Sequence, residues 1–156
     1  MQNVVGRFLA LRQVLYHYYT ELFSAMQESY KMTQMEINVL LFLANNPQYD
    51  TAAELVHIRR LAKSQVSSAV ENLVTRGYLE RQVDGRRIHL LLTEKAEPVI
   101  REGLACQEMF SETVFAGVSE EERAQLSALL DHIAQSARNA ACRETSGSVS
   151  ECDRES

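Results

Sequence analysis

The stretch that most constrains the fold is residues 63–93, KSQVSSAVENLVTRGYLERQVDGRRIHLLLT, where the spacing of apolar residues changes from helical to strand-like. Its first half predicts a helix, because apolar residues recur every three or four positions, at Val66, Ala69, Val70, Leu73 and Val74. We expect Ser64 to be the N-cap of this helix. Arg76 places a cation in its last turn, and Gly77 is the residue type that most easily adopts a left-handed conformation after a helix.

The second half of the stretch predicts a β-hairpin. Two runs with strand-like alternation, residues 78–83 and 88–93, flank Asp84-Gly85-Arg86-Arg87. Asp-Gly between two such runs is a strong signal for a tight turn, in which both central residues need a positive φ. A helix with a short, uncharged polar face, followed by a hairpin with arginines at its tip, suits a protein that inserts into the grooves of DNA.

Two shorter helices are predicted upstream. Thr33 and Glu36 form a capping box before residues 34–44, which are apolar almost all round and should be central. The same start signal recurs at residues 50–54 and opens a third helix that ends by Arg59. Two short helices joined by a tight turn and followed by a hairpin predict a winged helix-turn-helix.

Long helices are predicted at both ends of the chain, at about residues 3–30 and 94–141. The second is divided at Gly117, after which Ser119 and Glu122 form another capping box. These end helices carry more apolar surface than a winged helix of roughly 65 residues can cover. The surplus predicts a symmetric homodimer, with end helices packed against end helices.

The predicted fold class is therefore mainly α with a small β-hairpin wing, in which dimerisation helices flank a winged helix-turn-helix. We expect a single domain over residues 1–142, with its DNA-binding lobe at about residues 33–95. Residues 143–156 are rich in Ser and Glu and contain one large apolar side chain, Val149. This composition predicts a disordered tail.

Charge is unevenly distributed along the 156 residues. The net charge of −5 argues weakly against a nucleic-acid partner, but residues 59–87 hold seven cations against three anions, a local charge of +4. Charges beyond about 8 Å are largely screened at physiological salt, so the local sign governs attraction of a polyanion. For these cations alone, a solvated face of mixed charge is the alternative interpretation.

Other classes of protein find little support in the sequence. Cys106, Cys142 and Cys152 form no CxxC pair, which is typical of a reduced intracellular protein. Apolar runs are too short to cross a bilayer, and the N-terminus lacks an apolar stretch of signal-peptide type, so we expect a cytoplasmic protein. Histidine and cysteine spacing predicts no metal site. Without a nucleophile motif or a phosphate-binding loop, we expect neither a cofactor nor enzymatic activity.

The order of these elements and several motifs resemble the MarR family of bacterial transcription regulators. The matching pieces are T-x-x-E at 33–36, E-L-(x)7-K-S-x-V-S at 54–67, L-(x)3-G-(x)2-E-R at 73–81, D-x-R-R at 84–87 and L-T-E-K at 92–95. The resemblance implies a homodimeric repressor whose recognition helices enter successive major grooves of a pseudo-palindromic operator, with the wings in the minor groove. It also implies release from DNA when a small anionic or phenolic ligand binds between the dimerisation helices and the DNA-binding lobe.

Some positions depart from the family pattern. Ser68 and Asn72 stand where the recognition helix often carries arginines, and Arg60 and Ala96 stand where many members have glycine. The wing is about two residues shorter than usual. These departures leave the sequence preference and the reach of the wing open.

The candidate DNA contacts fall into chemical groups. Short polar side chains on the outward face of the recognition helix can hydrogen-bond to base edges, at Gln65, Ser67, Ser68 and Asn72. Phosphate contacts are expected from the helix start and the nearby cations, at Arg60, Lys63, Ser64 and Arg76. Arg86 and Arg87 are expected at a narrow minor groove, although one of them should pair with Asp84 and shape the turn.

A small-molecule pocket is predicted at an aromatic wall formed by Tyr16, His17 and Tyr19. Simple helix packing is the alternative for these side chains. Two other functions also remain open. Ser68 and Asn72, in place of cations, would suit a winged helix used for protein contacts without strong DNA binding, and Cys106 would suit a thiol-based redox-responsive regulator.

Overall fold

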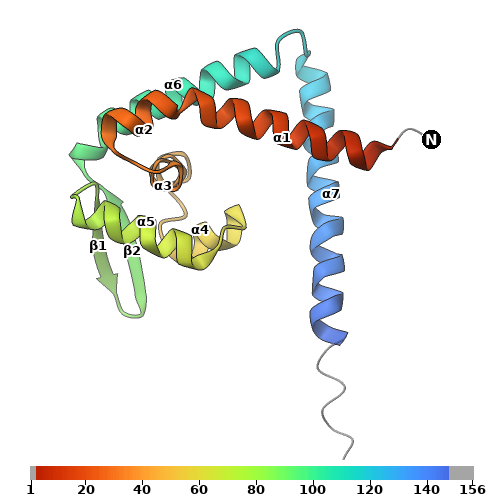
Figure 1. Ribbon diagram of the computed structural model, residues 1–156. Helices are drawn as coiled ribbons and strands as arrows, with labels where there is room; N and C mark the ends of the chain where they lie inside the picture. Colours follow the sequence, from red (N-terminus) through yellow and green to blue (C-terminus); the bar gives the residue numbers. More distant parts are fainter. Residues whose placement is uncertain (1–2, 148–156) are drawn as a thin grey trace, which may run out of the picture. The chain divides into compact units, whose positions relative to one another are not determined.

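The computed structural model describes residues 3–147. The chain forms two compact units that meet between Thr113 and Val114. The first contains α1 (Val4–Leu22), α2 (Ser24–Tyr30), α3 (Gln34–Asn45), α4 (Ala52–Arg59), α5 (Lys63–Thr75), β1 (Leu79–Asp84), β2 (Arg87–Leu92), the 3-10 turn η1 (Glu94–Ala96) and α6 (Glu97–Val114) (Figure 1). The second contains α7 (Glu120–Gly147). A mainly helical fold with a two-stranded wing is thereby confirmed.

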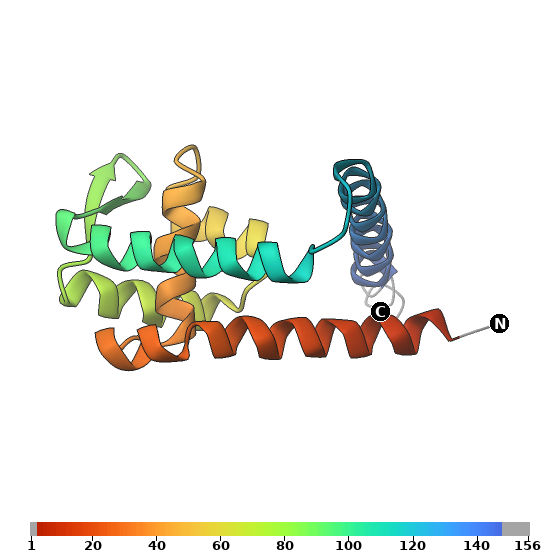
Figure 2. The same ribbon diagram turned by 90° about the horizontal axis from the view of Figure 1, so that it is seen from above.

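Helix α3 lies at the centre of the first unit. The predicted capping box starts it: the Glu36 amide donates to the Thr33 hydroxyl at 3.2 Å, and the Thr33 amide donates to the Glu36 carboxylate at 2.7 Å. Most of its side chains are buried, at Glu36, Ile37, Val39, Leu40, Leu41, Phe42 and Leu43. Figure 1 and Figure 2 show the cause, since α2 and α6 cover one side of α3 while α4 and α5 cover the other.

The wing is an antiparallel hairpin in which Asp84 pairs with Arg87. Its two-residue loop is therefore Gly85-Arg86, and of these two only Gly85 has a positive φ, +59°. The prediction that both central residues need a positive φ is wrong, because glycine in first place with an ordinary second residue is the pattern of a type II′ turn. The Leu90 amide donates to the Asp50 carbonyl at 2.7 Å, which attaches β2 to the segment before α4.

Two predicted helix boundaries are corrected. The N-terminal helix is interrupted at the fully buried Phe23, where the Thr20 and Ser24 hydroxyls donate to preceding carbonyls at 2.8–3.1 Å and compete with the helical pattern. Helix α5 begins at Lys63 with Ala62 as its N-cap, so Ser64 lies inside the first turn and caps nothing.

Helix α7 begins as expected. Gly117 has a φ of +77°. In the capping box that follows, the Ser119 amide donates to the Glu122 carboxylate at 2.8 Å and the Glu122 amide to the Ser119 hydroxyl at 3.2 Å. The helix continues to Gly147, beyond the expected end near residue 141. Most of the predicted disordered tail falls on residues 148–156, which lie outside the described residues.

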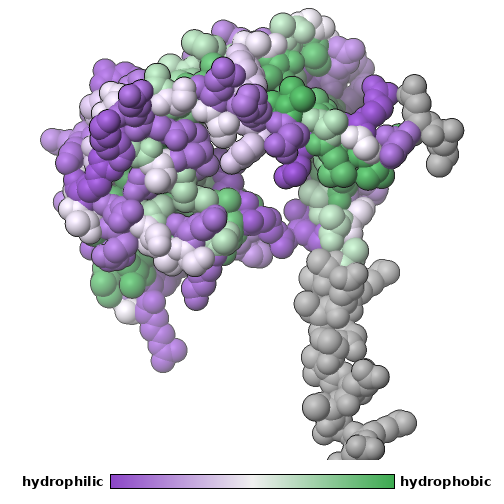
Figure 3. Space-filling view, in the orientation of Figure 1, coloured by the Kyte–Doolittle hydropathy of each residue, from purple (hydrophilic) through white to green (hydrophobic). Residues whose placement is uncertain are grey.

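Large apolar side chains remain exposed on the N-terminal half of α1, at Val4, Val5, Phe8, Leu9, Leu11 and Val14. Figure 3 shows hydrophobic surface there, beside the N-terminus. Helix α7 by itself exposes a similar stripe at Leu126, Leu129, Leu130 and Ile133. Over residues 3–147, none of the helices has the length and apolar character needed to span a membrane.

A close helix contact yields the first prediction. Gly103 of α6 is buried, and a Cβ placed on it would lie 2.8 Å from Cδ2 of the buried Leu41. Gly103→Ala should lower the free energy of unfolding by about 1–2 kcal/mol, because overpacking outweighs the gain in helix propensity. Denaturant unfolding measures this loss, with Ala105→Gly on the exposed face of α6 as the propensity control. A Gly103→Ala variant more stable than the wild type would contradict the contact.

Candidate nucleic-acid interface

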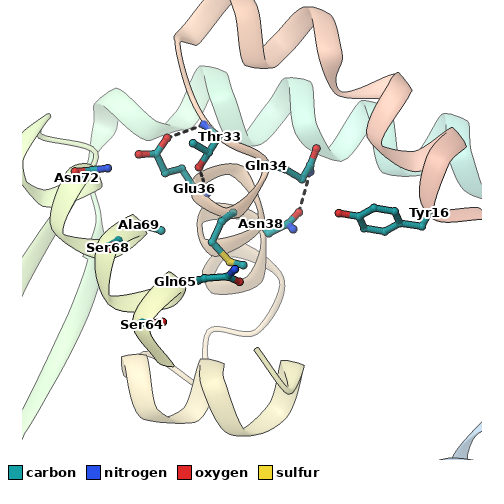
Figure 4. Close-up of a pocket in the computed structure, with 11 residues that line it drawn as sticks. Tyr16, Thr33, Gln34, Glu36, Asn38, Ser64, Gln65, Ser68, Ala69 and Asn72 are labelled. Carbon is teal, nitrogen blue, oxygen red and sulfur yellow. Dashed lines mark hydrogen bonds between the residues drawn. The ribbon is translucent and has the colours of Figure 1, made fainter. Parts of the chain in front are cut away.

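A polar groove runs between α3 and the outward face of α5. It has a volume of about 550 Å³ and is lined by Tyr16, Thr33, Gln34, Met35, Glu36, Asn38, Ser64, Gln65, Ser68, Ala69 and Asn72. Figure 4 shows Ser64, Gln65, Ser68 and Asn72 along one wall, on α5, with the α3 side chains opposite. Of the predicted recognition-helix contacts, the structure brings these four together.

Helix α3 contributes polar side chains that were not predicted from the sequence. The side-chain amide of Gln27 donates to the side-chain oxygen of Gln34 at 2.7 Å. The side-chain amide of Gln34 donates in turn to the side-chain oxygen of Asn38 at 3.0 Å. This chain of amides fixes the orientation of Gln34 and Asn38 in the wall of the groove. Their four-residue spacing places them on one face of a helix, but only the packing of α3 shows that this face lies toward α5.

Ser67 and Lys63 lie on a different side of α5. They line a separate, mostly apolar hollow of about 410 Å³ between α4 and α5, together with Ala52, Ala53, Val56 and Val66. The predicted set of base-contacting residues is therefore divided by the helix. Gln65, Ser68 and Asn72 share the groove with α3, whereas Ser67 does not.

Arg76 has a structural role that the sequence did not reveal. Its guanidinium donates to the carbonyls of Tyr30 at 2.6 Å and Lys31 at 2.9 Å, and it lies 5.2 Å from the ring centre of Tyr78. The Lys95 ammonium donates to the Arg76 carbonyl at 2.6 Å. Two of its five N–H donors therefore join the end of α5 to the end of α2, and the phosphate contact expected of Arg76 stays a prediction.

The two wing arginines differ in their surroundings. Arg87 forms an ion pair with Glu54 of α4 at 3.0 Å, so the predicted partner Asp84 is wrong. The neighbouring pair of His89 and Asp50, at 2.8 Å, joins the same strand to the same segment. Arg86 lies in the hairpin loop and is exposed, and within residues 3–147 no ion pair is recorded for it. The arrangement assigns anchoring to Arg87 and leaves Arg86 available to a ligand.

Glu54 is the carboxylate that binds Arg87 and thereby attaches the wing to α4. Burial would raise the pKa of its carboxyl, but hydrogen bonds from the hydroxyl and amide of Thr51, the charge of Arg87 and the Asp50 amide together lower that pKa below its ordinary value. The Thr51 hydroxyl donates to the carboxylate at 2.9 Å, and the Glu54 amide donates back to that hydroxyl at 3.2 Å. One carboxylate thus caps α4 and attaches the wing.

Arg60 occupies the turn between α4 and α5 with a φ of +53°, in the left-handed region. Arg60 is one of the positions noted above as a departure from the MarR pattern, in which many members have glycine. A side chain in this conformation costs about 1–2 kcal/mol. Arg60 is exposed and lies two residues before Ala62, the N-cap of α5.

The structure brings together two of the three residues predicted to line a small-molecule pocket. Tyr16 and Tyr19 line a cavity of about 230 Å³ with Gln34, Asn38, Leu55, Arg59 and Leu61, whereas His17 does not line it and is exposed. The Gln107 amide donates to the Tyr19 hydroxyl at 3.1 Å. This cavity and the polar groove share Tyr16, Gln34 and Asn38.

The structure adds no support for a redox role of Cys106 or, among the described residues, for a metal site. Burial, and then the charge of Glu102, raise the pKa of the Cys106 thiol, which disfavours the reactive thiolate. Its sulfur lies 3.6 Å from the Leu22 carbonyl oxygen. Cys142 and Cys152 lie outside the part of the chain whose side chains are described. Among the described residues, no cluster of three or more His, Cys, Asp or Glu side chains is placed to hold a metal ion.

A helix-turn-helix followed directly by an antiparallel hairpin defines a winged-helix protein. The sequence model of the MarR family matches residues 30–87 of this chain. Among solved structures, the transcriptional regulator PA3341 is 25% identical, with a TM-score of 0.73 over 86% of this chain and 98% of that one. No curated protein matches the sequence. Residues 30–87, which hold the helix-turn-helix and the first part of the wing, therefore resemble the MarR family of transcriptional regulators in sequence as well as in fold.

Two further structures share the fold at lower identity. A putative MarR family transcriptional regulator from Listeria monocytogenes, solved with a 26mer DNA, is 17% identical, with a TM-score of 0.75 over 94% of this chain and 97% of that one. BpsR of Bordetella bronchiseptica, whose DNA binding is regulated by 6-hydroxynicotinic acid, is 22% identical, with a TM-score of 0.64 over 83% of this chain and 98% of that one.

The lowered pKa of Glu54 yields a prediction about pH. A carboxyl whose pKa is depressed by folding stabilises the protein above its unfolded pKa, and this stabilisation is lost as pH falls through the folded value. Wild type should therefore exceed Glu54→Gln in free energy of unfolding near neutral pH, and the difference should shrink below about pH 4.5. Urea unfolding between about pH 7 and pH 3 measures it. A difference that stays constant over this range would contradict the assigned role.

Proposed function

We propose that this protein is a homodimeric repressor that binds a pseudo-palindromic duplex operator and is released from it by a small ligand. The observation that carries the proposal is the polar groove, in which α5 presents amide and hydroxyl side chains without a charge of its own. Gln65 and Asn72 can each hydrogen-bond to adenine in a bidentate manner, and Ser68 can donate or accept. The Listeria monocytogenes regulator that shares the fold was solved with DNA, which supports this choice of ligand.

Affinity would come from cations around α5 rather than on its face. Arg60 and Lys63 stand at its start, where they can contact phosphates that position the helix. Arg86 at the wing tip would enter a narrow minor groove, while Arg87 keeps the hairpin attached to α4 through Glu54. Base recognition and electrostatic attraction are thus assigned to different side chains.

Dimerisation would cover the exposed apolar surface of the end helices. The N-terminal half of α1 includes Val4 and Val14, whose side chains are 73% and 65% exposed, and α7 includes Leu129, which is 60% exposed. Such stripes are costly in water, and a two-fold interface buries both copies at once. A two-fold dimer would present two copies of α5 to half-sites about one helical turn apart, which implies a palindromic operator.

The effector would occupy the small cavity that Tyr16 and Tyr19 line. Arg59, in the same wall, offers a positive charge beside two phenol rings, which favours a small aromatic acid. Regulation of BpsR by 6-hydroxynicotinic acid supports a ligand of that class. Because Tyr16, Gln34 and Asn38 also line the polar groove, a bound ligand would alter the DNA-contacting surface directly.

A fluorescence titration with duplex DNA at several salt concentrations tests the function. DNA binding predicts a steep fall in affinity with salt, because each phosphate contact releases a counterion. Failure to bind any duplex at about 50 mM salt would favour the alternative of a winged helix used for protein contacts.

Base recognition predicts different outcomes for two neighbouring residues. Gln65→Ala should change the sequences recovered when the protein selects duplexes from a random library, because Gln65 lines the groove. Ser67→Ala should leave the selected sequences unchanged, since Ser67 lies in the separate hollow. An unchanged selection profile for Gln65→Ala would remove Gln65 from the base-contacting set.

The wing arginines should also differ. Arg86→Ala should reduce the slope of log affinity against log salt by about 0.9, the value for one lost phosphate contact. Arg87→Ala should instead lower stability with a smaller change in slope, because its guanidinium is paired with Glu54. Titration and unfolding of both variants measure the two effects. The opposite assignment would follow if Arg87→Ala gave the larger change in slope.

A further inference from the structure

Two exposed cations hold backbone conformations that favour glycine. Among residues 3–147, the non-glycine residues with a positive φ are Lys31, at +51°, and Arg60, at +53°. They occupy the C-caps of α2 and α4, a position at which helices commonly use glycine. An unfavourable backbone conformation that persists at an exposed side chain points to a function for that side chain.

The two cations lie at opposite ends of α5. Arg60 is two residues before the N-cap, Ala62. Lys31 is held at the other end, because Arg76, the C-cap of α5, donates to the Lys31 carbonyl at 2.9 Å and to the Tyr30 carbonyl at 2.6 Å. Within the described residues, no ion pair engages the Lys31 ammonium.

The turn that follows Lys31 leads into the polar groove. Thr33 and Gln34 line it opposite Ser68 and Asn72. In Figure 4, Thr33 and Asn72 lie toward the upper end of the groove and Ser64 toward the lower end. Any polymer seated against Gln65 and Asn72 would therefore also meet the α2–α3 turn.

The length of α5 suits the width of the major groove of a DNA duplex. Helix α5 has 13 residues and is about 20 Å long. The major groove of B-DNA is about 12 Å wide, with a phosphate backbone on each side. A cation at each end of α5 is therefore placed to reach both backbones when the helix lies in the groove.

We propose that the α2–α3 turn, Lys31–Gln34, is a third DNA-contacting element outside the helix-turn-helix and the wing. The Lys31 ammonium binds a phosphate on the strand opposite the one that Arg60 contacts. Arg76 is a positioning residue, which holds Lys31 against the end of α5 without contacting DNA itself. This inference rests on the proposed DNA-binding function.

Three variants at position 31 test the contact. Lys31→Gln keeps a long side chain and the backbone conformation but removes the charge, Lys31→Gly removes both, and Lys31→Arg keeps the charge. We expect the slope of log affinity against log salt to fall by about 0.9 for Lys31→Gln and Lys31→Gly, and to stay at the wild-type value for Lys31→Arg. Lys31→Gly should also unfold at a higher denaturant concentration than the wild type, which shows that its weaker binding is not misfolding.

The outcomes separate the inference from the function on which it rests. A wild-type protein without salt-dependent binding overturns both, whereas a normal wild type with an unchanged slope in Lys31→Gln overturns the inference alone. The role of Arg76 is tested in the same assay. If it only positions Lys31, Arg76→Gln should lower the slope in the wild type but add no further change to Lys31→Gln. An additional loss of about 0.9 in the double variant would make Arg76 a phosphate contact.

Discussion

Burial of α3 around most of its circumference is the constraint on which the other surfaces of the first unit depend. Its capping box fixes where the helix begins, and its apolar side chains then require cover on every side. Helices α4 and α5 pack on one side, and α6 approaches so closely that Gly103 meets Leu41. The orientation of the outward face of α5 follows from this packing, because Val66, Ala69, Val70 and Leu73 must face inward.

Contacts between distant segments then fix the C-terminal end of α5 and attach the wing to α4. Arg76 joins the end of α5 to the end of α2, and Glu54 joins the start of α4 to β2 through Arg87. Both are charge-assisted hydrogen bonds, which are stronger and more directional than neutral ones. They hold the polar groove and the wing in a defined geometry before any ligand binds, which lowers the entropic cost of binding.

Under the proposed function, uncharged and charged side chains would have different roles, base recognition and electrostatic attraction of DNA. Polar side chains in the groove carry no charge except that of Glu36, which is buried in its capping box. Under the proposed function they would discriminate between bases more than they would attract DNA. Cations at the turns and at the wing tip would supply the attraction. A net charge of −5 does not oppose such binding, because only charges within a screening length of a bound polyanion act on it strongly.

Local patterns in the sequence predicted most of the helices and the hairpin, but fewer of the contacts that side chains make with distant segments. The three capping boxes, the helical stripe of α5 and Asp84-Gly85 placed the helices and the hairpin, because each signal depends on residues within a few positions. The prediction of Ser64 as the N-cap was wrong, because the helix begins at Lys63 with Ala62 as its N-cap. The partners of Arg76 and Arg87 could not be predicted from local patterns, because they lie 33 to 46 residues away in the sequence. Gln34 and Asn38 could not be predicted as groove residues, because only the packing of α3 shows that their side of the helix faces α5.

If α5 lies in a major groove with a cation near each end, the protein must contact phosphates on both sides of that groove. Phosphate ethylation interference on a selected duplex tests it most directly. We expect interference on both strands bordering one major groove in each half-site, with half-sites about 34 Å apart. Interference confined to one strand, or absent from the major groove, would contradict it.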